Sequence, residues 1–464
     1  MSEQVEAFTP IAEKMRREGL PEIVIRNFQH YYVLLRSGET GLIPEADIQP
    51  VDALPDADAF VRDPALVAAG EAAMKEAVAI KLNGGLGTSM GLNRAKSLLT
   101  VKNDYTFLDI IARQAIQLGA PLVFMNSFST REDTLAALAP YPELQRNDIP
   151  LDFVQNKVPK LTQADLTPVT WSPNPALEWC PPGHGDIYVA LITSGMLDAL
   201  LDAGYRYAFV SNADNLGAVM DAAILGYFAA NDLPFMMEAA DRTESDRKGG
   251  HLARRDDGQL ILRESAQCPD EDKAAFEDVN RHRYFNTNNL WINLPALKRL
   301  MAEKGNVLGL PMIRNAKTVD PRDPDSTPVY QLETAMGSAI GVFPGSDAVR
   351  VSRSRFAPIK TTNDLLAVRS DAYVLTDDYR VVLDPSREQP PFIQLDSAYY
   401  KLIDAMETRF PKGAPSLIRC RSLIVEGDIH FGRDIVIEGD VHLVNETGAP
   451  LVVEDGSQLV GVKS

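Results

Sequence analysis

The sequence contains little cysteine and histidine and no long apolar run. Its 464 residues include three cysteines and six histidines. The cysteines, Cys180, Cys268 and Cys420, are too few and too scattered for a disulfide framework or a zinc site. No apolar run approaches the roughly 18 residues of a membrane-spanning helix, and the N-terminus does not resemble a signal peptide. We therefore expect a cytoplasmic protein without a membrane partner.

Positive charge is also scarce. Lysine and arginine together number 46 against 64 aspartates and glutamates, which gives a formal net charge of −18. A chain of this charge repels the phosphates of nucleic acids and anionic membranes, so we expect no nucleic-acid partner. A small anion can still bind in a local basic pocket, and a nucleotide is therefore not excluded. The length and the 45% hydrophobic content predict a globular protein of two or three domains.

Residues 76–375 alternate apolar strands with helices. The clearest strands are expected at 77–82, 121–125 and 207–210, and the clearest helices at 107–118, 186–203 and 219–230. This alternation predicts parallel pairing in an open α/β sheet, with ligands bound at the carboxyl ends of the strands. A smaller helical segment, residues 1–75, precedes this domain, because apolar residues recur there at helical spacing.

Residues 376–464 are predicted to be a separate C-terminal domain with a six-residue period. Two apolar series follow this period: Leu417, Leu423, Ile429, Ile435 and Val441, and Val425, Phe431, Ile437 and Leu443. Apolar residues at i and i+2 of a six-residue repeat are typical of a β-helix, whose inward side chains stack from coil to coil. A small stack of hairpins with chance spacing is the alternative. An exposed final coil can pair with another chain, so a homo-oligomer through this domain is a further expectation.

The strand at 77–82 leads into a glycine-rich turn, residues 83–97. Four glycines within eight residues let backbone N–H groups approach an anion. Arg94 and Lys96 add positive charge at the end of the turn. The spacing is neither that of a Walker loop nor that of the dinucleotide G-x-G-x-x-G motif. Alone, the turn favours a phosphate or nucleotide site over a plain tight turn.

This turn closely resembles the loop of the UTP–glucose-1-phosphate uridylyltransferases, the UDP-glucose pyrophosphorylases of the eukaryotic type. Further words match in the family's order over roughly residues 25–375. They are residues 121–128 (PLVFMNSF), 181–186 (PPGHGD), 209–218 (FVSNADNLGA), 248–250 (KGG), 285–291 (FNTNNLW), 331–335 (QLETA) and 354–360 (SRFAPIK). The resemblance implies a Rossmann-like, GT-A-like nucleotidyltransferase with a mixed sheet, and the terminal repeat fits the family's left-handed β-helix.

Two stretches depart from the family pattern. The chain has Arg94-Ala95-Lys96 where the family usually has Gly-Pro-Lys, so the rigidity of the loop differs while its lysine is kept. Residues 157–179 match poorly and are expected to have their own loop geometry.

The implied reaction is attack by an oxygen of glucose 1-phosphate on the α-phosphorus of UTP, which releases pyrophosphate. The nucleophile is already an oxyanion and needs no general base, which agrees with the scarcity of histidine. Two polyanions must meet, so fixed positive charge is required. By resemblance, Lys96 and Lys360 supply that charge, and Asp214 holds Mg²⁺. These three are the expected catalytic residues.

The resemblance also assigns residues to each substrate. UTP is expected to contact Leu82, Gly84, Gly85, Lys96, Met125, Gln155, Gly183, Asp214 and Lys360. The sugar phosphate is expected to contact His184, Asn212, Gly250, Glu264, Asn286 and Asn288. Ordinary structural roles compete with these assignments, since Asp214 can cap a helix, His184 can be structural and Lys360 can be a solvated lysine.

Alternative functions remain open at this point. Another UDP-sugar or a UDP-N-acetylhexosamine is a possible product, although the N-acetylhexosamine enzymes usually place a glycine after the loop lysine and Ser97 stands there instead. A catalytically inactive regulator that binds nucleotide sugars would be expected to lack a key lysine or aspartate, and all three are present. A scaffold built around the β-helix is the third alternative.

Overall fold

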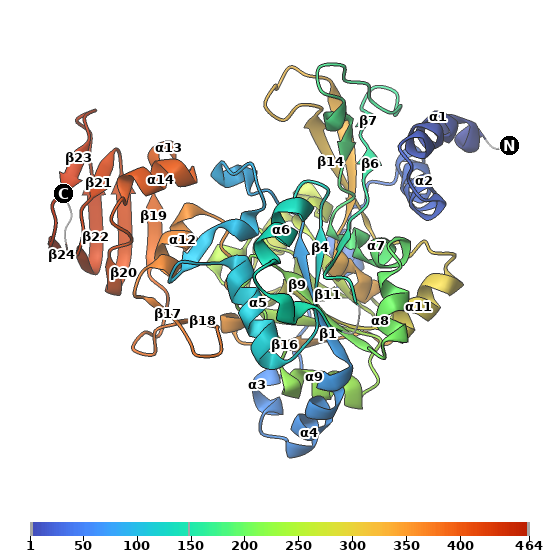
Figure 1. The fold of residues 1–464 in the computed structure, drawn as a ribbon. Helices are drawn as coiled ribbons and strands as arrows, with labels where there is room; N and C mark the ends of the chain where they lie inside the picture. The colour runs from blue at the N-terminus through green and yellow to red at the C-terminus, as the bar shows by residue number, and fades with distance from the viewer. Residues whose placement is uncertain (1–2, 147–148, 462–464) are drawn as a thin grey trace.

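The computed structural model describes residues 3–146 and 149–461, and a nine-stranded mixed sheet lies at its centre (Figure 1). Its order is β12-β11-β13-β9-β1-β4-β5, with β10 paired to β13 and β16. The strands are β1 (Ala77–Asn83), β4 (Leu122–Asn126), β5 (Asp152–Val154), β9 (Tyr207–Asn212), β10 (Phe235–Asp241), β11 (His251–Arg254), β12 (Leu260–Arg263), β13 (Tyr284–Asn293) and β16 (Asp347–Arg350). In the part of the chain that the structure describes, no helix is long and apolar enough to cross a membrane.

The expected parallel pairing holds for only one half of this sheet. β9, β1, β4 and β5 are parallel neighbours, as the strand–helix alternation predicts. β13 runs antiparallel to both β9 and β10, so the sheet as a whole is mixed, as the family resemblance implies. Between β10 and β13 the chain forms the antiparallel hairpin of β11 and β12, and β13 then returns alongside β10 in the opposite direction.

Helices cover both faces of the sheet because successive residues of β1 point to opposite sides. Ala77 and Ala79 join one core with α5 (Phe107–Leu118), whereas Val78 and Ile80 join the other with α7 (Ile187–Thr193). The remaining helices of the sheet domain are α6 (Arg131–Leu138), α8 (Met196–Asp202), α9 (Ala222–Ala230), α10 (Lys273–Glu277) and α11 (Leu294–Glu303).

The helix expected at 107–118 has those bounds. Thr106 and Asp109 form a capping box at its start, and Gly119 with φ 70° ends it. The helix expected at 186–203 is instead two helices, α7 and α8, because Gly195 lies between them in a left-handed conformation with φ 76°.

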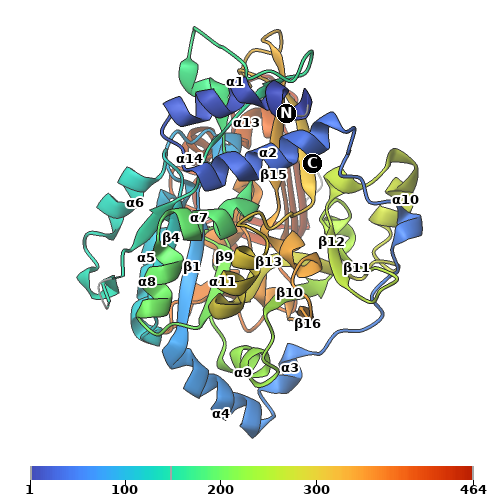
Figure 2. The same cartoon turned by 90° about the vertical axis from the view of Figure 1, so that its right-hand side faces the viewer.

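The N-terminal segment occupies two separate places (Figure 2). α1 (Glu3–Arg17) and α2 (Glu22–Arg36) pack together, and α2 reaches α7. α3 (Ala57–Phe60) and α4 (Pro64–Ala73) lie at the opposite end of the molecule, where α4 crosses α9. Gly226 makes that close crossing possible, since a Cβ at this position would lie 1.8 Å from the carbonyl oxygen of Leu66.

Small sheets extend from the central domain. β14 (Met312–Thr318), β15 (Pro328–Thr334) and β7 (Leu161–Thr162) form one of them. Two-stranded pairs join β2 (Thr100–Lys102) to β3 (Tyr105–Thr106) and β6 (Val158–Pro159) to β8 (Trp179–Cys180). β6 to β8 cover the stretch that matches the family pattern poorly.

The C-terminal segment consists mainly of parallel strands stacked side by side (Figure 1). The strands are β19 (Phe392–Leu395), β20 (Ser416–Glu426), β21 (Ile429–Phe431), β22 (Val436–Val444), β23 (Leu451–Val453) and β24 (Gln458–Val460). All nine positions of the two six-residue series are buried, and Leu423 pairs in register with Val441. α12 (Thr362–Arg369), the hairpin β17 (Tyr373–Leu375) and β18 (Val381–Leu383), α13 (Ser397–Tyr400) and α14 (Ile403–Arg409) complete this end.

Candidate active site

A cleft of about 330 Å³ opens where β1, β4 and β9 end. Predicted residues from five parts of the chain line it: Leu82, Gly84, Gly85, Lys96, Met125, Gln155, Gly183, His184, Asn212 and Asp214. It lies at the carboxyl edge of the parallel half of the sheet, as expected for an α/β fold. The structure therefore brings together every residue predicted for the nucleotide except Lys360.

The glycine-rich turn is folded so that its backbone faces this cleft. Gly87 and Gly91 adopt φ values of 61° and 80°, which glycine tolerates without strain. The N–H of Lys96 returns to the carbonyl of Gly85 at 3.1 Å and closes the turn. A Cβ on Gly84 would lie 3.1 Å from Oε1 of Gln155, so the glycine lets that amide lie against the turn.

Lys96 and Asp214 form an ion pair in the cleft. Their Nζ and Oδ2 atoms are 2.7 Å apart, and their side chains are 15% and 27% exposed. Lys96 comes from the end of the glycine-rich turn and Asp214 from the turn after β9, so the adjacency of β1 and β9 brings them together. A partly exposed lysine of this kind is available to a phosphate that enters the cleft.

Sequence reasoning missed Ser97 as a site residue. Ser97 is among the residues that line the cleft, and its buried hydroxyl has no hydrogen-bond partner among the described residues. Buried polar groups are nearly always paired, so an orphaned hydroxyl at this place fits a bound polar ligand. Its position directly after the loop lysine was the signal available in the sequence.

A buried carboxyl group holds the turn that carries Gln155 in place. The backbone N–H and the side-chain amide of Asn156 donate to Asp186 at distances of 2.6 to 3.1 Å. Burial raises the pKa of Asp186 to about 7, against the opposing effect of these hydrogen bonds. Asp186 thus positions the turn of Gln155 from the start of α7.

His184 enters the cleft as a neutral hydrogen-bond donor. The backbone N–H of Met336 donates to its Nδ1 at 2.9 Å, which places the ring proton on Nε2. Burial lowers the pKa of His184 to about 4. Its neighbour Gly183 packs against the end of β15, where a Cβ would lie 2.5 Å from the carbonyl oxygen of Thr334.

The other predicted residues form a second group. Asn286 donates through its backbone to the carbonyl of Gly250 at 3.2 Å and through Nδ2 to Oδ1 of Asn288 at 2.8 Å. A Cβ on Gly250 would lie 2.4 Å from Glu264. Burial raises the pKa of Glu264, and the positive charge of Lys360 opposes that rise, so this lysine acts electrostatically on the second group.

The two groups meet at Met336 and Gly337. Met336 contacts His184 of the cleft, and a Cβ on Gly337 would lie 2.7 Å from Nδ2 of Asn286. The segment of Lys360 also reaches the cleft, because the N–H of Ile359 donates to the carbonyl of Asp214 at 3.3 Å. The two groups are therefore neighbours in the structure.

We expect the ring of His184 to stay neutral between pH 5.5 and 8. The unfolded imidazole titrates near pH 6.5 and the buried one near 4, so its contribution to stability is complete above 6.5 and is lost as the pH falls toward 4. NMR titration of labelled histidine, assigned with His184→Asn, measures the midpoint. The denatured chain is the control, and a folded-state midpoint near 6.5 contradicts the prediction.

Comparisons with known proteins agree over most of the chain. A family model described as UTP–glucose-1-phosphate uridylyltransferase matches residues 26–438. The protein of that name from Solanum tuberosum is 41% identical over 389 residues, which cover 82% of this chain and 79% of the relative. The protein of the same name from Saccharomyces cerevisiae is 41% identical over 392 residues, which cover 82% and 77%.

Solved structures give the same result. A mutant of UDP-glucose pyrophosphorylase from Leishmania major in complex with UDP-glucose is 46% identical, with a TM-score of 0.91 over 98% of each chain. The UDP-glucose phosphorylase of Trypanosoma brucei is 48% identical, with a TM-score of 0.89 over 98% of this chain and 99% of that one. The chain therefore belongs to the UTP–glucose-1-phosphate uridylyltransferase family.

Proposed function

We propose that this protein transfers the uridylyl group of UTP to glucose 1-phosphate and releases pyrophosphate. The observation that carries the proposal is the cleft itself, where a glycine-rich turn, Lys96 and Asp214 meet beside Gln155 and His184. The family membership and the UDP-glucose complex of the Leishmania major relative support the same substrates.

The nucleotide occupies the cleft at the end of β1. The amide of Gln155 pairs with O4 and N3–H of uracil, because one amide offers both a donor and an acceptor. Leu82, Met125 and Gly183 enclose the base, and the turn at Gly84 and Gly85 presents its backbone toward the phosphates. The orphaned hydroxyl of Ser97 donates to a phosphate oxygen.

The hexose lies between the cleft and the second group. His184 donates its Nε2 proton to a sugar hydroxyl, and Asn212 lines the cleft beside it. Glu264, Asn286 and Asn288 supply acceptors and donors to the other hydroxyls. Gly250 has no side chain, which leaves room for the carboxylate of Glu264.

The chemical step needs charge and alignment and no proton transfer. An oxygen of glucose 1-phosphate forms a bond to the α-phosphorus as the bond to the bridging oxygen of pyrophosphate breaks. Lys96 leaves its partner Asp214 to stabilise the charge that develops on pyrophosphate. Lys360 approaches from the second group and stabilises both phosphates.

The donor set of Asp214 fits Mg²⁺. Asp214 is the one carboxylate among the described residues that line the cleft, and no group of three or more histidine, cysteine or acidic residues suited to a metal occurs in the described ranges. Mg²⁺ commonly binds to one or two carboxylates and completes its octahedron with phosphate and water. When bound, it neutralises phosphate charge. Asp214 would hold it once Lys96 turns to the nucleotide.

A panel of sugar phosphates tests the proposed activity. Pyrophosphate release is measured with UTP, Mg²⁺ and glucose 1-phosphate, galactose 1-phosphate or N-acetylglucosamine 1-phosphate, with Lys96→Ala as the inactive control. We expect glucose 1-phosphate to give the highest kcat/KM. A higher value for another sugar identifies a different UDP-sugar pyrophosphorylase, and no release with any sugar identifies a nucleotide-sugar-binding regulator.

Lys360→Ala is expected to lower kcat by at least about 100-fold, because it removes a cation that acts in the transition state. The Kd for UTP should change far less, since Lys96 and the glycine-rich turn remain. Steady-state kinetics and equilibrium binding separate the two effects. Lys298→Ala, which removes an exposed lysine paired with Asp198, is the matched control. An unchanged kcat removes Lys360 from the mechanism.

We also propose that residues 376–464 are a domain built on a left-handed β-helix that joins copies of the chain. Its parallel strands and nine buried six-residue positions support the coil. The outermost strands leave Leu451, Val452 and Val460 exposed, which is the apolar edge that a second copy would cover. The free thiols of all three cysteines support action in the cytoplasm.

Charge on this edge is expected to dissociate the assembly. Val452→Glu combined with Val460→Glu places two anions on the outer strands, and sedimentation velocity should report a smaller particle than the unchanged chain. Val61→Glu, at an exposed apolar residue just after α3, is the matched control and should sediment like the unchanged chain. Equal sedimentation of all three proteins rejects assembly through this edge.

A further inference from the structure

Three sequence words that resemble the family meet in a buried polar cluster. Asn215 follows Asp214, Asn289 lies on β13, and Arg355 precedes Lys360 by five residues. The amide Nδ2 of Asn215 donates to Oδ1 of Asn289 at 3.2 Å and to the carbonyl of Arg355 at 3.1 Å. None of the three residues lines the cleft, so binding of substrate does not account for them.

Glu238 of β10 is the anion at the centre of this cluster. Its carboxylate is fully buried and accepts two hydrogen bonds from the guanidinium of Arg355, both at 2.7 Å. Asn289 and the indole of Trp291 each donate a further bond at 3.0 Å. A buried carboxylate is costly unless it is paired and fully hydrogen-bonded, and this one is satisfied by four donors in a fixed geometry.

The cluster holds the Lys360 segment against the Asp214 turn. The carbonyl of Arg355 accepts from both Asn215 and Asn289, at 3.1 and 3.2 Å. The N–H of Ala357 returns to Oδ1 of Asn215 at 3.0 Å, so the two segments share bonds in both directions. The approach is so close that a Cβ on Gly217 would lie 2.4 Å from the carbonyl oxygen of Ser354.

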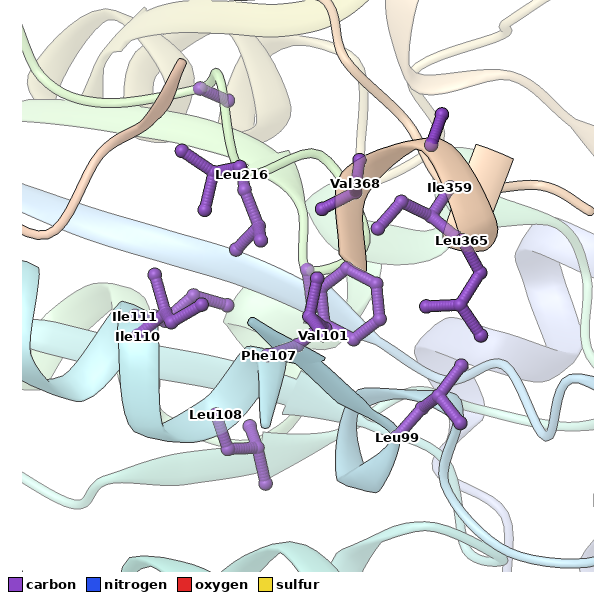
Figure 3. Close-up of a cluster of buried hydrophobic side chains, with 14 of the residues drawn as sticks. Leu99, Val101, Phe107, Leu108, Ile110, Ile111, Leu216, Ile359, Leu365 and Val368 are labelled. Atoms are coloured by element: carbon purple, nitrogen blue, oxygen red, sulfur yellow. The ribbon is translucent and has the colours of Figure 1, made fainter. Parts of the chain in front are cut away.

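Apolar packing also stabilises the contact between the Lys360 segment and the Asp214 turn. Leu216 and Ile359, one from each segment, lie in the cluster of buried side chains that Phe107 and Ile111 of α5 also join (Figure 3). Packing holds both segments against the same apolar cluster. The directed hydrogen bonds of Asn215 fix the position of one segment relative to the other.

We propose that Asn215, Asn289, Glu238 and Arg355 form a joint that sets the position of Lys360 relative to Asp214. They are positioning residues, since they touch neither substrate. The inference rests on the proposed role of Lys360. Misplacement of a reacting group by about 1 Å can lower the rate by about 100-fold, so a joint of this kind affects turnover more than binding.

The test is a double-mutant cycle between Asn215 and Lys360. Asn215→Ala is expected to lower kcat by about 10- to 100-fold and to change the Kd of UTP by less than about 3-fold. In the background of Lys360→Ala, the same change should lower kcat by less than about 3-fold, because its target is already absent. Asn293→Ala removes another buried asparagine of β13, which caps α11, and is the matched control for lost stability.

The outcomes are distinguishable. Equal kcat losses in both backgrounds overturn the joint, because they show that Asn215 acts without Lys360. A kcat unchanged by Lys360→Ala alone overturns the proposed role of that lysine instead. If Asn215→Ala does not fold, Asn289→Ala enters the same cycle. A kcat loss of similar size in the Asn293→Ala control, at a similar loss of melting temperature, assigns the effect to stability and also rejects the joint.

Discussion

The ion pair between Lys96 and Asp214 is the contact on which the account of the site depends. The proposed reaction requires a chain with a net charge of −18 to admit two polyanions, and this pair places a lysine at the carboxyl edge of the sheet. Without substrate, the aspartate neutralises this lysine. In the proposed mechanism, a phosphate takes the lysine and leaves the carboxylate to hold a divalent cation. One pair would thus supply both the cation and the metal ligand of the proposed mechanism.

The mixed sheet explains how residues far apart in the sequence meet around that pair. The parallel neighbours β1 and β9 end side by side, which brings the glycine-rich turn to the Asp214 turn. The antiparallel strand β13 then carries Asn286 and Asn288 toward the second group and Asn289 into the buried cluster. If β13 ran parallel to β9, Asn286 and Asn288 would lie toward the opposite edge of the sheet, away from the carboxyl end of β9.

Local patterns allowed much of this structure to be predicted. The helix at 107–118, the apolar residues of β1 and the six-residue series are each encoded within a short segment, and each is found in the structure. The family assignment from the sequence words is confirmed by the family model and the relatives. One of these words supplied His184, and the resemblance outside them supplied Gln155; the structure places both in the cleft.

Contacts between distant segments could not be predicted in this way. Glu238 lies in an apolar strand, and its partner Arg355 is 117 residues away, so no local pattern marks the pair. The separation of α1 and α2 from α3 and α4 depends on which face of the sheet domain each pair covers. Ser97 was missed because the lack of a partner for its hydroxyl appears only when the cleft is formed.

A crystal structure with UTP and Mg²⁺ tests the central claim most directly. The account predicts uracil against Gln155, the triphosphate over the glycine-rich turn, and Nζ of Lys96 moved from Asp214 to a phosphate oxygen. A nucleotide bound away from the end of β1, or a triphosphate in the cleft with the Lys96–Asp214 pair still closed, would contradict it.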